Sequence, residues 1–261
     1  MIARADIIAW REQAPWPLNE QVEQDLVISR ALVDIYSDDF LKERLAFRGG
    51  TALHKIYLKP AARYSEDIDL VQITAEPIGS TLDRLRERLS FLGKPKIKQG
   101  DLMTTLTYRF DSEIPPIVPM KLKVEINCRE HFTVDGYKTT PLKVDTNWYK
   151  GECELVTFSA EELLSTKLRA LYQRKQGRDL FDLDHSMKKH DLNVSKIING
   201  FSEYLKRGGH EIKKDDYLKN MEEKLHDDEF QGDIAFLLRP QIEFEFDGAW
   251  RNVRENIIEK L

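Results

Sequence analysis

The chain has 261 residues, enough to bury a hydrophobic core in one large domain or in two closely packed domains. Hydrophobic residues make up 41% of the chain and charged residues 33%, which excludes a disordered protein. The formal net charge of -5 excludes a general polyanion binder, so any nucleic-acid surface must be a local patch.

The cysteines and the first residues indicate the cellular compartment of the protein. Cys128 and Cys153 form neither a metal-spaced motif nor a disulfide framework, which favours a reducing cytoplasm. Asp6 and Arg11 leave no room for the apolar region of a signal peptide. No apolar run approaches the ~20 residues of a membrane helix. We therefore expect a cytoplasmic protein without membrane contact.

The first predicted helix begins after Asn19, a plausible cap, because apolar residues then recur at helical spacing. The segment before it, which holds Trp10 and Trp16, is expected to be an irregular arm. A short helix is expected over residues 39–44.

A glycine-rich turn follows, with the sequence Arg48-Gly49-Gly50-Thr51. It precedes a helix predicted over residues 51–58, which Pro60 ends. Residues without Cβ let backbone N–H groups approach a phosphate, and the helix start adds positive charge. The alternative is an ordinary turn.

Asp67 and Asp69 open a strand predicted over residues 67–73. Residues i and i+2 of a strand share a face, so the two carboxylates project together about 6.6 Å apart. At an effective dielectric of about 20 their repulsion is roughly 2.5 kcal/mol, which a cation would remove. Carboxylate oxygens suit Mg2+, or Mn2+ as an alternative, bridging to substrate phosphates. Ser65 can add a hydroxyl at the same rim; the alternative is a solvated turn.

An amphipathic helix is predicted over residues 81–91, followed by strands over 104–110 and 121–127 with period-two alternation. The alternation leaves Glu125 on the polar face, where pairing with Lys123 is one explanation. Either an RNA-backbone contact or a solvated helix face with a lysine-edged strand explains the basic stretch of Arg84, Arg86, Arg88, Lys94, Lys96 and Lys98.

The chain becomes helical from Ser159, where Ser159 and Glu162 form a predicted capping box. Leu164, Leu168 and Leu171 form the core stripe of the helix that follows. A further helix begins at 178, and others are expected around 201–205, over 234–238 and over 250–261. A second basic rim consists of Lys206, Arg207, Lys213 and Lys214.

Together these motifs resemble a known enzyme family. Arg48-Gly-Gly-Thr followed by Asp67-Ile-Asp-Leu resembles the first motif of nucleotidyltransferases of the DNA polymerase β superfamily. Gly-Gly-Thr-Ala-Leu with Arg63-x-Ser-x-Asp-Ile-Asp-Leu is similar to the AbiEii toxin family, the nucleotidyltransferase half of type IV toxin-antitoxin and phage-abortive systems. Lys167-Leu-x-Ala-Leu followed by Arg178-Asp-Leu-x-Asp-Leu fits the second half of that pattern.

The resemblance implies an α+β fold. A polymerase-β-like mixed sheet with flanking helices is expected over residues 1–155, followed by a C-terminal helical bundle over 156–261 that completes the active site. Glu125 would be the third metal ligand beside Asp67 and Asp69. Lys167 would contact the triphosphate, and Asp179 would be a catalytic or orienting carboxylate.

From the same resemblance we expect the nucleotide to be bound by Gly49, Gly50, Thr51, Ser65, Lys167, Arg178 and Asp182. Asp179 also has a structural explanation, because the helix dipole favours an acid in the first turn. An Arg178–Asp182 pair at i, i+4 is likewise ordinary on a helix.

The activity implied is Mg2+-dependent transfer of a nucleoside monophosphate from an NTP to an acceptor. Relatives modify the 3′ end of tRNA and inhibit translation, and the family has a cognate winged-helix antitoxin that represses transcription. In related toxins a serine at the position of Ser65 can be phosphorylated. Two alternatives stay open: transfer to a small molecule or a protein, and a non-enzymatic module that binds RNA or a partner.

Overall fold

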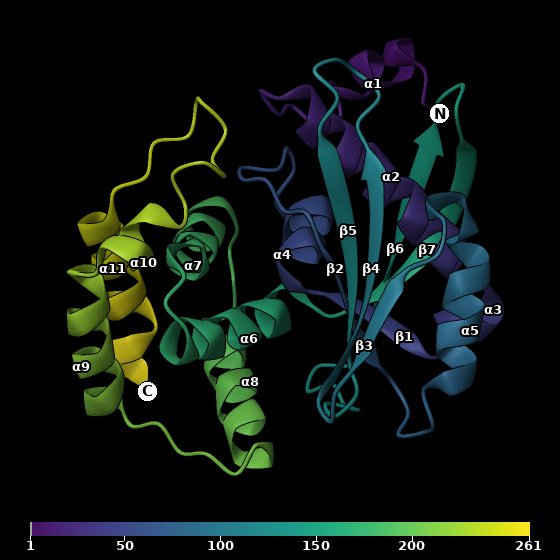
Figure 1. The fold of residues 1–261 in the computed structure, drawn as a ribbon. Coiled ribbons are helices and arrows are strands. Elements are labelled where there is room, and N and C mark those ends of the chain that lie inside the picture. Colours follow the sequence, from purple (N-terminus) through teal and green to yellow (C-terminus); the bar gives the residue numbers. More distant parts are fainter. Residues whose placement is uncertain (1) are drawn as a thin grey trace. The chain divides into compact units, whose positions relative to one another are not determined.

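The computed structural model describes residues 2–261. Its contacts divide the chain into two compact units, shown in Figure 1. The first comprises Met1–Thr133 and Tyr137–Phe158, and the second comprises Val134–Gly136 and Ser159–Leu261. The domain boundary at residue 155 stays a prediction, because a compact contact unit need not fold alone.

One mixed sheet of seven strands organises the first unit, in the order β3-β4-β5-β2-β1-β7-β6. β2 runs parallel to β5 and β1 runs parallel to β7, whereas the other neighbouring pairs are antiparallel. The strands are β1 (Leu45–Arg48), β2 (Ile68–Gln72), β3 (Lys96–Gln99), β4 (Met103–Asp111), β5 (Pro119–Asn127), β6 (Lys138–Asp145) and β7 (Lys150–Thr157).

The long helix α2 packs against β5, β6 and β7, and α5 packs against α2 and α3. The helices of this unit are α1 (Arg4–Trp10), α2 (Asn19–Tyr36), α3 (Asp39–Lys42), α4 (Gly49–Ala52) and α5 (Gly79–Arg88), with a π-helical turn over Leu53–Tyr57 and a 3-10 turn over Ser90–Leu92.

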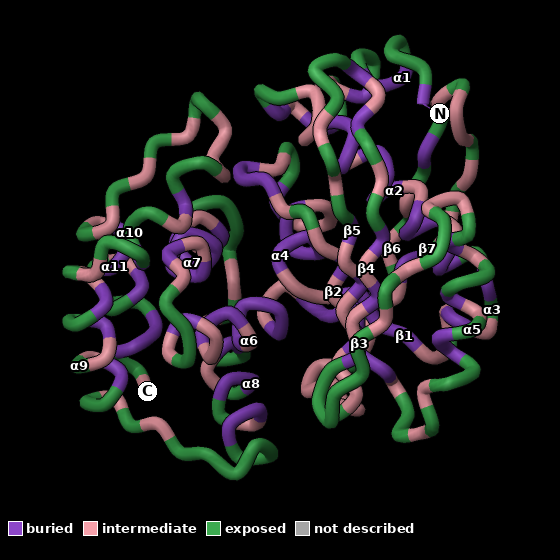
Figure 2. Tube along the Cα trace, viewed as in Figure 1, coloured by how far each residue is buried: buried purple, intermediate pink, exposed green. Residues whose placement is uncertain are grey.

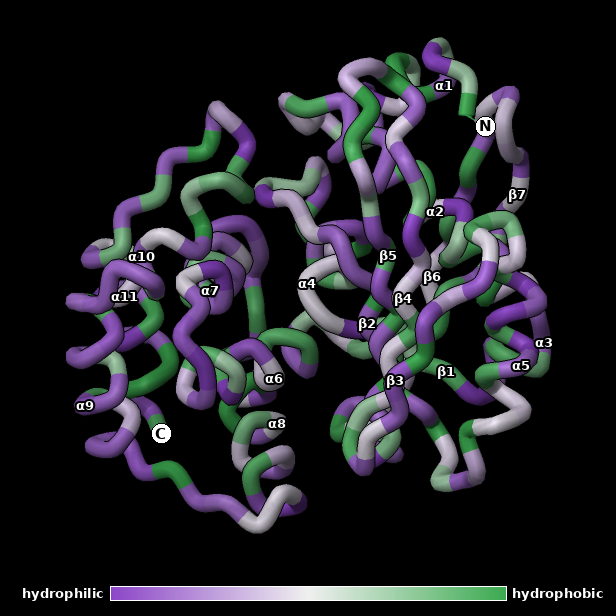
Figure 3. Tube along the Cα trace, in the orientation of Figure 1, coloured by the Kyte–Doolittle hydropathy of each residue, from purple (hydrophilic) through white to green (hydrophobic). Residues whose placement is uncertain are grey.

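Strands β4 and β5 follow the predicted alternation. Leu106 and Tyr108 on β4, and Leu122 and Val124 on β5, are fully buried, while the residues between them are partly or fully exposed. Figures 2 and 3 show the same alternation of burial and hydropathy along these strands. The sheet therefore has an apolar face and a polar face at this end.

The second unit consists of helices. They are α6 (Ala160–Gln173), α7 (Gly177–Lys189), α8 (Val194–Arg207), α9 (Lys214–Leu225), α10 (Asp228–Gly232) and α11 (Phe246–Asn256), followed by a 3-10 turn over Ile258–Lys260. α6 packs against α7 and α8, and its predicted stripe of Leu164, Leu168 and Leu171 is fully buried. The predicted α+β fold is confirmed. None of the helices within residues 2–261 is both long and apolar enough to cross a membrane.

The cap of α6 differs in part from the prediction. The Ser159 hydroxyl accepts from the Glu162 N–H at 3.2 Å, as expected. The Glu162 carboxylate, however, accepts from the backbone N–H groups of Val134 and Asp135 and from the Tyr204 hydroxyl, at 2.8 to 3.0 Å. Glu162 therefore holds residues 134–136 in the second unit.

Several local predictions are wrong. The expected irregular arm contains helix α1. Leu18 occupies the N-cap position of α2 without a side-chain cap, because Asn19 lies inside the helix and accepts from Arg11. Residues 234–238 were expected to be helical, but 234–237 form turns and Leu238 forms a β-bridge. Strands β6 and β7 were not predicted, since most β6 residues are exposed or half-buried and give no clear alternation.

Candidate active site

The glycine-rich turn lies directly against a carboxylate. β1 ends at Arg48 and α4 begins at Gly49, whose φ of +80° belongs to the left-handed region that favours glycine. A Cβ at Gly49 would lie 2.0 Å from Oδ2 of Asp69. Any side chain here would displace Asp69, so Gly49 is required for the carboxylate to hold its position.

Gly50 makes room for a second functional group. A Cβ at Gly50 would lie 2.4 Å from a guanidinium nitrogen of Arg63. Arg63 is only 3% exposed and donates to the Tyr64 carbonyl at 3.0 Å. Arg63 was not among the predicted site residues, although it begins the Arg-x-Ser-x-Asp motif. Its charge lies against the turn expected to bind phosphate.

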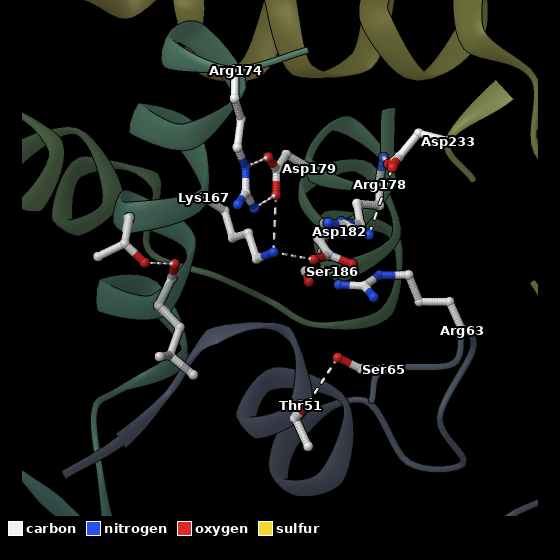
Figure 4. Close-up of polar contacts among 12 residues, drawn as sticks. Thr51, Arg63, Ser65, Lys167, Arg174, Arg178, Asp179, Asp182, Ser186 and Asp233 are labelled. Atoms are coloured by element: carbon white, nitrogen blue, oxygen red, sulfur yellow. Dashed lines mark hydrogen bonds and ion pairs between the residues drawn. The ribbon is translucent and has the colours of Figure 1, made fainter. Parts of the chain in front are cut away.

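Hydrogen bonds join the turn to the start of β2 (Figure 4). The Thr51 hydroxyl donates to the Asp67 carbonyl at 2.6 Å and lies 2.8 Å from the Ser65 hydroxyl. Thr51 is 2% exposed, whereas Ser65 is half-buried. The geometry therefore gives Thr51 a positioning role and leaves Ser65 nearer the surface.

The three predicted metal ligands come from two neighbouring strands. Asp69 on β2 pairs in register with Glu125 on β5, and Asp67 directly precedes β2. Paired residues of neighbouring strands project to the same face, and so do residues i and i+2. The Lys123 ammonium lies 3.7 Å from Oδ2 of Asp67. From the sequence, Lys123 was expected only as a partner of Glu125.

Asp67 carries an electrostatic cost. Burial raises the pKa of Asp67 to about 6, and Asp69, Glu66 and Glu125 add to the increase, while Lys123 opposes it. Its Oδ1 atom is buried and has no hydrogen-bond partner among the described residues. A buried carboxylate oxygen normally has a partner, so we expect a ligand to supply one for this atom.

These residues fit a magnesium ion. The hard carboxylate oxygens of Asp67 and Asp69 are suitable electron-pair donors to Mg2+, and Oδ1 of Asp67 has no other partner among the described residues. Among residues 2–261, no three His, Cys, Asp or Glu side chains form a complete metal-binding group. Mg2+ commonly binds one or two carboxylates together with substrate phosphates and water. Glu125 stays a predicted third ligand.

The predicted residues of the second unit form a buried ionic cluster (Figure 4). The Lys167 ammonium lies 2.9 Å from Asp179 and 2.9 Å from Asp182, and both carboxylates are fully buried. Arg174 makes two hydrogen bonds to Asp179, at 2.7 and 2.9 Å. We call Lys167, Arg174, Asp179 and Asp182 the ionic cluster. Arg174, which precedes the short link between α6 and α7, was not among the predicted site residues.

Asp179 is held in its ionised form. Burial alone would raise the pKa of Asp179, but the Lys167 ammonium and the Arg174 guanidinium outweigh burial and keep that pKa below its usual value. Because a carboxylate with a low pKa is a weak proton acceptor, these partners favour the orienting role of Asp179 over the catalytic one.

Arg178 has a different partner from the one that helix spacing suggested. Its backbone N–H donates to Asp233 at 3.1 Å, and its guanidinium lies 3.6 Å from the same carboxylate. Asp182 pairs with Lys167 instead. Nucleotide binding by Arg178 and Asp182 stays a prediction.

The structure therefore brings the predicted residues together in two sets. Within the first unit it gathers Gly49, Gly50, Thr51, Ser65, Asp67, Asp69 and Glu125. Within the second unit it gathers Lys167, Asp179 and Asp182.

Comparison with known proteins identifies the family of the chain. Residues 30–256 match the model of the family described as "Nucleotidyl transferase AbiEii toxin, Type IV TA system". The fold is similar to that of MenT4, a nucleotidyltransferase toxin from Mycobacterium tuberculosis, with a TM-score of 0.64, 18% identity and coverage of 100% of this chain and 91% of that one. A proposed nucleotidyltransferase from H. pylori gives a TM-score of 0.52 and 19% identity, over 92% of this chain and 95% of that one. No curated protein matches the sequence.

Proposed function

Since the chain belongs to the AbiEii family of nucleotidyltransferase toxins, we propose that it transfers a nucleoside monophosphate from an NTP to the 3′ end of tRNA in a Mg2+-dependent reaction. The family is a type IV toxin-antitoxin family, which implies a nucleotide substrate and an antitoxin partner. Blocking tRNA ends would inhibit translation and growth, and this target would place the protein in the cytoplasm.

The observation that carries the proposal is the carboxylate pair of the first unit. Asp67 and Asp69 share a face with Glu125, and Gly49 leaves space for Asp69. The raised pKa and the unsatisfied oxygen of Asp67 are costs that folding alone does not explain. Such costs are typical of sites built to bind a cation or substrate.

Each predicted site residue of the first unit has a role in this proposal. Asp67 and Asp69 would hold Mg2+, with Glu125 as a third ligand; when bound, Mg2+ neutralises phosphate charge and stabilises the pyrophosphate leaving group. The backbone of Gly49 and Gly50 would approach the phosphates closely, because neither residue has a Cβ. Ser65 would add a hydroxyl donor at the same place.

The ionic cluster has a separate task in the proposal. Lys167 is our predicted cation for the charge that develops on the leaving pyrophosphate. Asp179 and Asp182 fix the Lys167 ammonium from two directions, at 2.9 Å each. Fixed orientation is valuable because the charge then needs no rearrangement during the reaction. Asp179 is accordingly a positioning residue in this proposal.

The test is transfer of label from each α-32P-labelled NTP to total bacterial RNA, with Mg2+ or with EDTA. We expect wild type to label a tRNA-sized band only with Mg2+, and Asp69→Asn to label nothing. Asp111→Asn removes an exposed carboxylate of the same sheet and is expected to retain full transfer.

The same experiment identifies other acceptors. Label in the protein fraction would indicate a protein acceptor, and transfer that requires an added small molecule would indicate a small-molecule acceptor. Either result would contradict the tRNA proposal but retain nucleotidyltransfer. Equal labelling in EDTA would contradict the Mg2+ proposal.

The antitoxin proposal is more specific than the family description. We propose that the partner is a winged-helix transcriptional repressor encoded nearby. Expression of such a neighbour is expected to restore growth of cells that express this chain. Growth inhibition that no neighbouring gene relieves would contradict the proposal.

A further inference from the structure

Strands β3, β4 and β5 present a charged face beside the carboxylates. Residues at alternate positions of these strands share a face, and residues paired across strands also share it. Five basic residues occupy this face, and we call them the basic face: Lys96, Lys98, Arg109, Lys121 and Lys123.

The strand register connects the basic face to the proposed metal ligands. Lys98 and Glu125 pair with the same β4 residue, and Glu125 pairs in turn with Asp69 on β2. One row of side chains therefore runs from the edge strand to the carboxylates. The next row ends at Lys123, whose ammonium lies 3.7 Å from Asp67. Rows are about 6.6 Å apart along a strand, and neighbours in a row are about 4.8 Å apart.

Most charges of the basic face are uncompensated. Within the described part of the chain, Lys96, Lys98, Arg109 and Lys121 make no ion pair, and all four are exposed. Solvated lysines on an edge strand can simply prevent aggregation. That explanation covers Lys96 and Lys98 on β3, but it does not cover Arg109 and Lys121 on the inner strands.

The arginines of α5, unlike the lysines of the basic face, have partners within the protein. They are therefore less suitable for binding RNA. Arg84 pairs with Asp38 at 2.6 Å, and Arg86 pairs with Asp83 at 3.1 Å. Arg88 donates to the Asp34 carbonyl at 3.0 Å. Of the basic stretch singled out in the sequence, the arginines are therefore used within the protein, whereas Lys96 and Lys98 remain available.

The residue types on this face suit a sugar–phosphate backbone. Lys and Arg bind phosphate oxygens, and Thr105 and Thr107 lie among them with hydroxyl groups for phosphate or sugar. None of the side chains that β3, β4 and β5 place on this face is aromatic, so bases have no stacking platform there. The acidic exceptions are Glu125, beside the metal ligands, and Asp111, at the end of β4.

We propose that the basic face binds the backbone of the acceptor RNA and guides its 3′ end to Asp67 and Asp69. The proposal rests on the proposed function, because it assumes that the acceptor is RNA. Contacts to phosphate and sugar carry no direct sequence information. The face would therefore contribute affinity and orientation, and would accept RNA of different sequences.

The test measures binding of fluorescently labelled tRNA and single-turnover transfer to it, for wild type and for Lys96→Gln/Lys98→Gln. Both lysines are exposed and neither belongs to the proposed catalytic set. Loss of two single-strand phosphate contacts should reduce the salt slope of log K by about 1.4 and weaken binding about tenfold at low salt. The transfer rate at saturating RNA and the affinity for Mg-NTP should stay unchanged.

A matched control removes the same charge from the opposite edge of the sheet. Lys143→Gln/Lys150→Gln changes two exposed lysines on β6 and β7. We expect this variant to bind tRNA with the wild-type salt slope. Equal losses in both double variants would mean that only net charge matters, which would overturn the proposal.

Two further outcomes would also overturn it, and they differ in what they say about function. If wild type labels tRNA but Lys96→Gln/Lys98→Gln binds tRNA normally, RNA is the acceptor and binds elsewhere. If wild type binds no tRNA yet transfers nucleotide to another acceptor, both the RNA acceptor and the RNA-binding role of the basic face are wrong.

A second double variant, Arg109→Gln/Lys121→Gln on the inner strands, is expected to weaken tRNA binding in the same way as Lys96→Gln/Lys98→Gln.

Discussion

The carboxylates of the two units stand in opposite electrostatic situations. Asp179 is fully buried but pairs with both Lys167 and Arg174, and its pKa is lowered. Asp67 is only half-buried, with 28% of its side chain exposed, yet its pKa is raised to about 6 and one of its oxygens has no partner. Depth of burial therefore does not decide which carboxylate is uncompensated.

This difference separates two kinds of role. A buried charge with complete partners is tolerated by the fold and can fix a neighbouring group. A charge without complete partners costs stability, and it is retained where a ligand supplies the missing partner. The comparison supports the proposals that Asp179 positions Lys167 and that Asp67 binds a ligand; Asp69, two residues further on, shares the face of Asp67.

The largest expected effect on stability is that of Asp179→Asn. The substitution leaves the buried Lys167 and the Arg174 guanidinium with one fewer anion, and breaking a buried pair costs about 3–5 kcal/mol of unfolding free energy. Chemical denaturation measures this cost. A loss below about 1 kcal/mol would show that the partners of Asp179 do not stabilise its buried charge, which would contradict the contrast with Asp67.

A smaller loss is expected for Gly49→Ala. The new Cβ would meet Asp69 in addition to straining a φ of +80°, so we expect a loss of about 2–3 kcal/mol together with reduced transfer. Gly209→Ala is the matched control, because Gly209 has a similar φ of +70° but open space around it. It should lose only about 1 kcal/mol and retain transfer. Equal losses would show that Asp69 simply moves aside.

Asp67→Asn should stabilise the protein in EDTA above pH 6. Because the pKa of Asp67 is about 6 when folded and near 3.8 when unfolded, the folded state binds the proton more tightly. Unfolding free energy should therefore fall as pH rises from about 4 to about 6, by about 2 kcal/mol. Asn cannot ionise, so the difference between variant and wild type should grow over this range. A constant difference would contradict the raised pKa.

The smallest effect is expected for Lys175→Gln. Lys175 pairs with Asp227 at 2.6 Å, but 56% of its side chain is exposed and water screens the pair. The melting temperature should stay within experimental error of wild type. A loss similar to that of Asp179→Asn would show that ionic contacts near the α6–α7 link are equally important regardless of burial.

Local sequence patterns predicted the parts of the molecule that depend on neighbouring residues. Period-two alternation located β4 and β5, and the glycine-rich turn lies against Asp69, whereas the metal site there stays a prediction. Arg63 and Arg174 were missed because their importance comes from contacts across turns. Local patterns do not specify such contacts.

The basic face likewise depends on contacts that local sequence patterns do not specify. Lys96 and Lys98 were recognised as basic in the sequence, but strand register was needed to place Lys123 and Arg109 with them. Residues 234–238 were misread as helix because apolar residues alone do not distinguish a helix from a series of turns.

The most direct test of the central claim measures transfer and stability on the same preparations of wild type, Asp69→Asn and Asp179→Asn. Loss of a metal ligand should reduce nucleotide transfer at least about 10³-fold in Asp69→Asn, while its melting temperature stays at or above that of wild type. Asp179→Asn should show the large loss of stability. Transfer by folded Asp69→Asn within tenfold of wild type would contradict the claim that Asp67 and Asp69 hold the metal ion for transfer.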